Sequence, residues 1–381
     1  MSETQSCSNR VWPPDERPLH LVAPSTETAS SEDAVFYTAA PELPEKWQFD
    51  SDVAEFEQIG CERIDDYGTI WHHRARMTDG SVYSVDTSDP FDRRVNVLVG
   101  STPALGTKND GLYRRLQLNL MRMHYPGVFI STEQSAQKRS LARSAHNLLK
   151  LYEHESDAMR AETDKLIMLG MSQGAMKALA ACALAPYFGE TQDGIKIIYA
   201  DLNRACFFER LDISRPLETA RQYIQQGKDE LFSVAHHVRR LPLRALLHYP
   251  KTVDLSPRGL HTAAHSLPML VSGETGQFPP YIPRDAQIYL EAAVHDTMSQ
   301  PEVAKELFKH HSGVRVWVVD KKQDAHTGGC FGEESHSGFV QRMGELATQI
   351  QANTSPTGSV DYSKLDFSNI HHRAPWHRPA L

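Results

Sequence analysis

Lys165-Leu-Ile-Met-Leu-Gly170-Met-Ser172-Gln-Gly174-Ala-Met-Lys-Ala-Leu-Ala180 is the stretch that decides the fold. Its apolar run, residues 166–169, is typical of a strand buried on both faces. The Ala-rich pattern that follows favours a helix, because alanine is the best helix former. Between them, glycines two residues before and after Ser172 allow the sharp strand-to-helix turn that exposes a serine hydroxyl. The stretch therefore predicts a nucleophile elbow.

Upstream of the elbow, the pattern predicts two early antiparallel strands and two central strands. Residues 69–71 and 81–85 alternate like strands and flank Asp79-Gly80, a strong hairpin turn signal. Short continuous apolar runs at 95–99 and 127–130 are candidates for central strands. Helical spacing of apolar residues within 112–123 and 135–155 predicts a helix after each of these strands.

Downstream, the alternation of strands and helices is interrupted once. A strand over 195–200 ends at Asp201, and residues 203–266 then show helices and loops without a clear strand, as expected for an inserted helical cap. Beyond the cap the sequence predicts a strand over 267–273, a largely helical stretch over 285–310, a last strand over 314–319 and a final helix over 338–350. This order predicts an α/β fold with a mostly parallel, doubly wound sheet.

The predicted domain organisation has four parts. Residues 1–50 are polar and rich in Ser, Thr, Glu and Pro, so we expect a flexible N-terminal arm. The core comprises 51–202 and 267–352, the helical cap comprises 203–266, and residues 353–381 form a polar tail that we expect to be loose.

The composition excludes several classes of protein. A net charge of −8 without long runs of like charge does not fit a nucleic-acid binder. No apolar run reaches the roughly 18 residues of a membrane span, and residues 1–30 lack the apolar region of a signal peptide. The odd number of scattered cysteines favours reduced thiols over disulfides or a zinc site, and hence a cytoplasmic protein. These cysteines are Cys7, Cys61, Cys182, Cys206 and Cys330.

Taken together, these features resemble the α/β-hydrolase superfamily. They are the elbow at Ser172, the early antiparallel strands, the apolar strand ending at Gly100, the insertion after Asp201 and a histidine after the last strand. The resemblance covers roughly residues 60–350 and implies no cofactor and no metal. It also implies a triad in the chain order serine, carboxylate, histidine, because a serine hydroxyl needs a base, and the base needs a carboxylate that orients it.

His326 matches the base, since it follows the last predicted strand among small residues. The chain has 19 histidines, and His336 is the nearest rival, at the entry to the final helix.

The acid of the triad has two candidates. Most superfamily members place it in a Gly-x-x-Asp turn after the penultimate strand, where this sequence has Gly273-Glu274-Thr275-Gly276. Other members place it at the strand after the elbow helix, where Asp201 stands. We prefer Asp201, while Glu274 remains an alternative.

The resemblance also implies an oxyanion hole built from two N–H groups. One is the amide of Gln173, directly after the serine. The other comes from the loop after the strand over 95–99, where Pro103 has no N–H, so Ser101 or Thr102 must donate. Without that role, Ser101 and Thr102 belong to an ordinary turn.

The sequence thus predicts a serine hydrolase that cleaves a small carboxylic ester or thioester through an acyl-enzyme on Ser172. An acyltransferase using the same nucleophile is one alternative. A non-catalytic binding protein of the same fold is the other, because a fold does not imply a function. The oligomeric state is left open.

Overall fold

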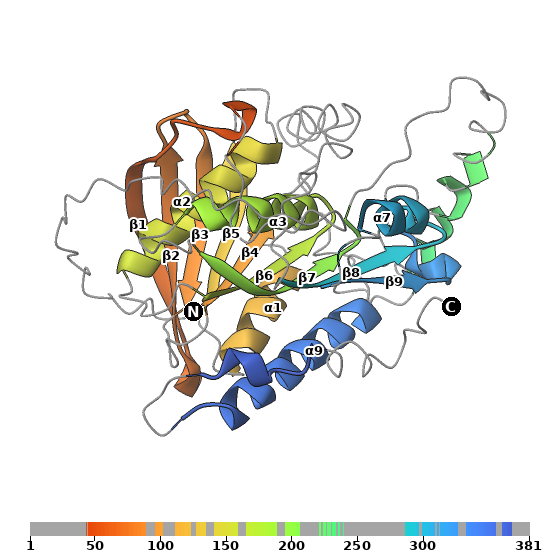
Figure 1. Cartoon of the computed structure of the whole chain (residues 1–381). Coiled ribbons are helices and arrows are strands. Elements are labelled where there is room, and N and C mark those ends of the chain that lie inside the picture. Colours follow the sequence, from red (N-terminus) through yellow and green to blue (C-terminus); the bar gives the residue numbers. More distant parts are fainter. Residues whose placement is uncertain are drawn as a thin grey trace, which may run out of the picture.

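The structure is a computed structural model of the whole chain (Figure 1). The residues it describes are 43, 45–88, 96–101, 111–122, 127–134, 141–158, 165–188, 195–205, a set of residues between 221 and 239, 286–296, 299–308, 311, 313–326, 333–355 and 360–367. Most of the predicted N-terminal arm, most of the predicted cap and the predicted strand over 267–273 lie outside this set. Of the arm, residues 43 and 45–50 are described, and Trp47 is buried in the hydrophobic core.

Within the described residues, one sheet has the strand order β1-β2-β3-β5-β4-β6-β7-β8-β9. The strands are β1 (Val53–Ile64), β2 (Gly68–Met77), β3 (Val82–Ser88), β4 (Asn96–Ser101), β5 (Gly127–Gln134), β6 (Lys165–Met171), β7 (Lys196–Asn203), β8 (Gln287–Ala293) and β9 (Val314–Val319). The pairs from β1 to β5 are antiparallel, and those from β5 to β9 are parallel. The mostly parallel sheet with an antiparallel N-terminal part is confirmed.

Helices cover both faces of the sheet. The α-helices with described bounds are α1 (Gly111–Arg122), α2 (Leu141–Ala158), α3 (Gln173–Leu184), α7 (Pro301–Phe308) and α9 (Glu333–Ala352). Short 3₁₀ turns are η1 (Glu45–Trp47), η2 (Asp65–Tyr67), η3 (Ala185–Tyr187), η5 (Lys322–Asp324) and η6 (Tyr362–Lys364). Figure 1 shows α2, α3 and α7 on one face and α1 and α9 on the other.

Two hydrophobic clusters lie on opposite faces of the sheet, and β6 contributes to both. Leu166 and Met168 pack with α2 and α3, whereas Ile167 and Leu169 pack in the cluster that contains residues of α9. Successive side chains of a strand point to opposite faces, so a central strand must be apolar throughout. This is why residues 166–169 show no polar alternation.

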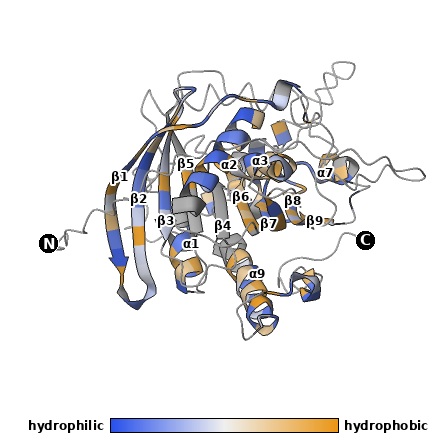
Figure 2. Ribbon diagram, turned by 60° about the vertical axis from the view of Figure 1, so that its left-hand side comes forward, coloured by the Kyte–Doolittle hydropathy of each residue, from blue (hydrophilic) through white to orange (hydrophobic). Residues whose placement is uncertain are grey.

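The predicted hairpin is confirmed as β2 and β3. Gly80 has φ +80°, and its N–H donates to the carbonyl of Met77 over 2.9 Å. The sequence did not predict β1, which pairs with β2 at the edge of the sheet. Figure 2 shows more hydrophilic colour along β1 and β2 than along β6 and β7. Charged side chains such as Glu55 and Glu57 hid the strand pattern, although charge is a common protection for an exposed sheet edge.

The prediction of a largely helical stretch over 285–310 is wrong in its first half. Residues 287–293 form β8, between β7 and β9, and the helix α7 begins only at Pro301. Ile288, Tyr289 and Leu290 are all fully buried. A strand buried on both faces has no alternating pattern, so periodicity alone does not distinguish it from a buried helix.

The segment after α9 is also more ordered than predicted. The side-chain amide of Gln349 donates to the carbonyl of Asp366 over 3.0 Å, and its oxygen accepts the N–H of Asp366 over 2.6 Å. The Phe367 ring stacks on Tyr199 at 5.9 Å, and Leu365 is buried. Residues 360–367 therefore pack against the core, while 356–359 and 368–381 lie outside the described residues.

Two cysteines are described, and they differ. Cys182 in α3 is a free buried thiol, and burial raises its pKa to about 12. Cys61 in β1 is disulfide-bonded, so the prediction of reduced thiols is wrong at this position. Because disulfides persist mainly in oxidising compartments, the cysteines no longer argue for the cytoplasm. Among the described helices, none is long and apolar enough to cross a bilayer.

Candidate active site

The elbow predicted at Ser172 is a tight turn between β6 and α3. Ser172 has φ 54° and ψ −125°, a backbone conformation that is uncommon for a residue with a side chain. Its N–H donates to the carbonyl of Asn203 in β7 over 2.9 Å, and its own carbonyl accepts the N–H of Ala175 over 3.0 Å. The strained turn is thus held from the neighbouring strand and from the first turn of α3.

Gly170 is required by the close approach of β6 and α3. A Cβ atom at this position would lie 2.6 Å from the Cα of Ala175 and 2.6 Å from the carbonyl oxygen of Gly174. Both neighbours are backbone, so they cannot move aside cheaply. The glycine two residues before the serine therefore has a steric reason in this chain.

His326 lies directly over the elbow serine. Its Nε2 is 2.7 Å from the Oγ of Ser172, although the two residues are 154 positions apart. The histidine follows β9 and the short turn η5, and its side chain is almost completely buried. The structure thus brings together the nucleophile and base candidates of the sequence.

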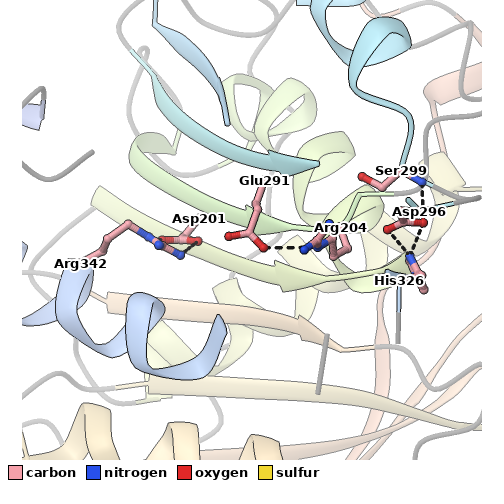
Figure 3. Close-up of polar contacts among 7 residues, drawn as sticks. All are labelled: Asp201, Arg204, Glu291, Asp296, Ser299, His326 and Arg342. Atoms are coloured by element: carbon pink, nitrogen blue, oxygen red, sulfur yellow. Dashed lines mark hydrogen bonds and ion pairs between the residues drawn. The ribbon is translucent and has the colours of Figure 1, made fainter. Parts of the chain in front are cut away.

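The carboxylate against His326 is Asp296. The Nδ1 of His326 is 2.9 Å from Oδ2 and 3.1 Å from Oδ1 of Asp296, whose side chain is fully buried (Figure 3). The N–H of Ser299 donates to Oδ1 over 3.0 Å, which fixes the carboxylate. With Nδ1–H donating to Asp296, Nε2 is left as the nitrogen that can accept the hydrogen bond of the Ser172 hydroxyl.

Asp201, the preferred acid of the sequence analysis, is not the carboxylate at His326. Arg342 of α9 donates to it twice, from Nε to Oδ2 over 2.6 Å and from Nη2 to Oδ1 over 3.0 Å. Tyr199 also donates to Oδ2 over 3.3 Å. Figure 3 shows this pair at the opposite end of the row of charged residues from His326. Asp201 therefore neutralises a buried arginine.

The sequence contained a signal for Asp296 that the wrong helix prediction hid. Asp296 stands three residues after Ala293, the end of β8. Because β8 is the penultimate strand, this offset matches the Gly-x-x-Asp turn in which superfamily members carry the acid, with alanine in place of glycine. The other acid candidate, Glu274, lies outside the described residues.

Two of the predicted oxyanion residues lie at the elbow. Gln173 is the first residue of α3, where backbone N–H groups have no partner within the helix. Ser101 is the last residue of β4, which pairs with β6 through Gly100 and Gly170. Thr102 lies outside the described residues. Among the residues that the structure does describe, no three His, Cys, Asp or Glu side chains cluster as metal ligands.

No protein-family model and no curated protein matches the chain. Solved structures similar to it include an esterase of Pyrococcus furiosus, at 12% identity and a TM-score of 0.45, with 85% of this chain and 96% of that chain covered. A 2-hydroxy-6-oxo-6-phenylhexa-2,4-dienoate hydrolase of Rhodococcus sp. strain RHA1 has 13% identity and a TM-score of 0.47, covering 71% and 97%. A haloalkane dehalogenase of Bradyrhizobium elkani has 14% identity and a TM-score of 0.46, covering 74% and 99%.

The connectivity of the sheet decides the fold. An antiparallel start leads into a parallel sheet with helices on both faces, and the elbow joins β6 to α3 at the centre. The chain has the α/β-hydrolase fold. In this α/β-hydrolase fold, Ser172, Asp296 and His326 follow β6, β8 and β9, so the three side chains meet at the carboxyl edge of the sheet, where ligands of open α/β sheets bind.

Proposed function

We propose that the protein is a serine hydrolase that cleaves a carboxylic ester or thioester through an acyl-enzyme on Ser172. The observation that carries this proposal is the continuous contact from Ser172 Oγ to His326 Nε2, at 2.7 Å, and from His326 Nδ1 to Asp296, at 2.9 Å. Both distances are within the reach that general base catalysis needs.

The mechanism follows from the direction of these contacts. Ser172 Oγ attacks the substrate carbonyl while His326 Nε2 takes the hydroxyl proton. The buried carboxylate of Asp296 stabilises the imidazolium that forms. His326 then returns the proton to the departing alcohol or thiol. A water molecule, deprotonated by the same nitrogen, hydrolyses the acyl-enzyme and releases the acid.

The negative charge on the carbonyl oxygen needs preorganised donors. The N–H of Gln173, at the start of α3, is the first, and the helix N-terminus adds a favourable electrostatic field. Ser101 or Thr102 is proposed as the source of the second N–H. Removal of one such donor typically costs about 3 kcal/mol of transition-state stabilisation.

A non-catalytic binding role is less well supported, because it gives no reason for a strained serine, a buried carboxylate and a histidine to converge. Acyl transfer would use the same acyl-enzyme with an alcohol in place of water. Hydrolysis and acyl transfer are distinguished by adding an acceptor alcohol and measuring whether an ester product replaces the free acid.

The test is covalent labelling of the purified protein with a fluorophosphonate, followed by turnover of p-nitrophenyl esters and acyl thioesters of increasing chain length. We expect the label on Ser172, and we expect Ser172→Ala to abolish both labelling and turnover. A folded wild-type protein that takes no label, or an Ser172→Ala variant with unchanged ester turnover, would overturn the proposal.

A further inference from the structure

The residue after β7, Arg204, shares an unusual feature with the elbow serine. Among the described residues other than glycine, only Ser172 and Arg204 have positive φ, at 54° and 55°. The two occupy equivalent positions, since Met171 pairs with Asn203 in the parallel register of β6 and β7. Backbone strain of this kind persists only where the surroundings hold it, and it concentrates at functional sites.

Backbone hydrogen bonds connect Asn203 and Arg204, at the end of β7, to the neighbouring segments on both sides. The carbonyl of Asn203 accepts the N–H of Ser172 over 2.9 Å, and the N–H of Arg204 donates to the carbonyl of Glu291 in β8 over 2.9 Å. Two consecutive residues therefore fasten the nucleophile turn on one side and β8 on the other. Asp296 lies five residues after Glu291 on the same chain segment.

The side chains of Arg204 and Glu291 also link the end of β7 to β8. Nε of Arg204 is 3.3 Å from Oε1 of Glu291, and the two side chains are only 1% and 2% exposed. This contact is an ion pair without hydrogen-bond geometry, since Nε and Nη1 of Arg204 make no hydrogen bond within the part of the chain that the structure describes. Figure 3 shows the pair between the Arg342–Asp201 pair and the Asp296–His326 contact.

We propose that Arg204 and Glu291 are positioning residues that hold the carboxyl ends of β7 and β8 together, and with them the distances from His326 to Ser172 and Asp296. This inference rests on the proposed hydrolase function. Because the guanidinium is almost completely buried, it acts through the strand ends and does not contact substrate. Displacements near 1 Å at a catalytic centre are enough to lower a rate about 100-fold.

The test compares Arg204→Met, Arg204→Lys, Glu291→Met and the double variant Arg204→Met/Glu291→Met. Fluorophosphonate labelling of Ser172 is measured against pH and normalised to the folded fraction from circular dichroism. We expect each Met variant to label at least about 10-fold more slowly, with a changed pH dependence, and Arg204→Lys to recover part of the rate. We expect the double variant to be no slower than the slower single variant, because both changes break one contact.

Arg342→Met is the matched control, because it removes an equally buried arginine that pairs with a carboxylate of the same sheet. We expect it to lower the melting temperature while its labelling rate per folded molecule stays within about threefold of the wild type. Equal losses of rate in Arg342→Met and Arg204→Met, or a normal rate and pH profile in Arg204→Met, would contradict the positioning role.

A second readout does not depend on catalysis. The proton in the His326–Asp296 hydrogen bond is expected to give a far-downfield ¹H NMR signal that Asp296→Asn abolishes. If the wild-type protein takes no label, the proposed function fails, and this signal still tests the positioning. Loss of the signal in Arg204→Met with retention in Arg342→Met supports it, and retention in both overturns it.

Discussion

Asp296, which follows β8, and Asp201, which lies within β7, are both buried carboxylates, and their partners give them different roles. His326 contacts Asp296, and Arg342 binds both oxygens of Asp201. Because Asp296 contacts the imidazole and Asp201 contacts the guanidinium, the two residues should respond differently to the loss of charge.

We expect Asp296→Asn to lower the rate of ester turnover about 10⁴-fold, because the amide no longer stabilises the imidazolium or selects its tautomer. Asp201→Asn should instead destabilise the fold, by up to about 3–5 kcal/mol, because Arg342 loses its counter-charge. Turnover per folded molecule and urea denaturation separate the two effects. A 10⁴-fold loss in Asp201→Asn at full folding would contradict this assignment.

Gly170→Ala tests the steric argument at the elbow. The new methyl group would overlap backbone atoms of Gly174 and Ala175, so we expect a loss of about 1–3 kcal/mol in unfolding free energy and slower labelling of Ser172. Gly60→Ala in β1 is the control, because the nearest atom to its new Cβ is 3.9 Å away. Equal melting temperatures of the two variants would show that the close approach is unimportant.

At the scale of elements, the packing of the antiparallel strands on α2 buries neutral histidines. His73 in β2 is 5% exposed, and its ring lies 4.8 Å from that of Phe56. Burial lowers the pKa of His73 from 6.5 to about 4. Burial also lowers the pKa of His146 in α2, which is 2% exposed. This part of the sheet should therefore be sensitive to acid.

The direction in which pH changes the free energy of unfolding follows from proton binding. Between pH 4 and pH 6.5 the unfolded chain protonates at His73 while the folded protein does not, so the stability contribution is complete above about 6.5 and is lost as the pH falls towards 4. For His73 alone the loss is about 3 kcal/mol. Urea denaturation from pH 7.5 to 4 should show a shallower loss for His73→Phe than for wild type. An identical pH dependence in His73→Phe and wild type would exclude His73 as the origin of the acid sensitivity.

The segment after α9 tests another contact between elements. The stacking of Phe367 on Tyr199 covers part of the cluster between the sheet and α9. We expect Phe367→Ala to cost about 1–3 kcal/mol of unfolding free energy without changing the labelling of Ser172. Phe232→Ala is the control, since its ring is 52% exposed and should contribute little. Equal stability of the two variants would contradict a packing role for residues 360–367.

At the scale of the whole molecule, the order of strands in the sheet brings the residues of the candidate active site together. Ser172, Asp296 and His326 are far apart in the sequence, and the parallel order β6-β7-β8-β9 brings their loops to one edge. Figure 3 shows the charged pairs Arg342–Asp201, Arg204–Glu291 and His326–Asp296 in a row that leads along the strands towards this edge.

The sequence by itself determined the elements whose patterns are local. Residues 165–180 carried the strand, the turn and the helix of the elbow, because a buried strand must be apolar and a tight turn needs small residues. The Asp79-Gly80 turn specified the hairpin in the same way. The position of His326 after the last strand, read through the superfamily resemblance, gave the candidate base.

Only the tertiary structure decided which carboxylate lies against His326. Asp201 and Asp296 lie on or after neighbouring strands, and their roles differ because their distant partners differ, Arg342 in one case and His326 in the other. The strand β8 was concealed for a related reason, because the hydrophobic clusters on both faces of the sheet bury its side chains and so remove the alternation that marks a strand. Local patterns specify secondary structure, whereas pairings between distant segments depend on the packing of the whole chain.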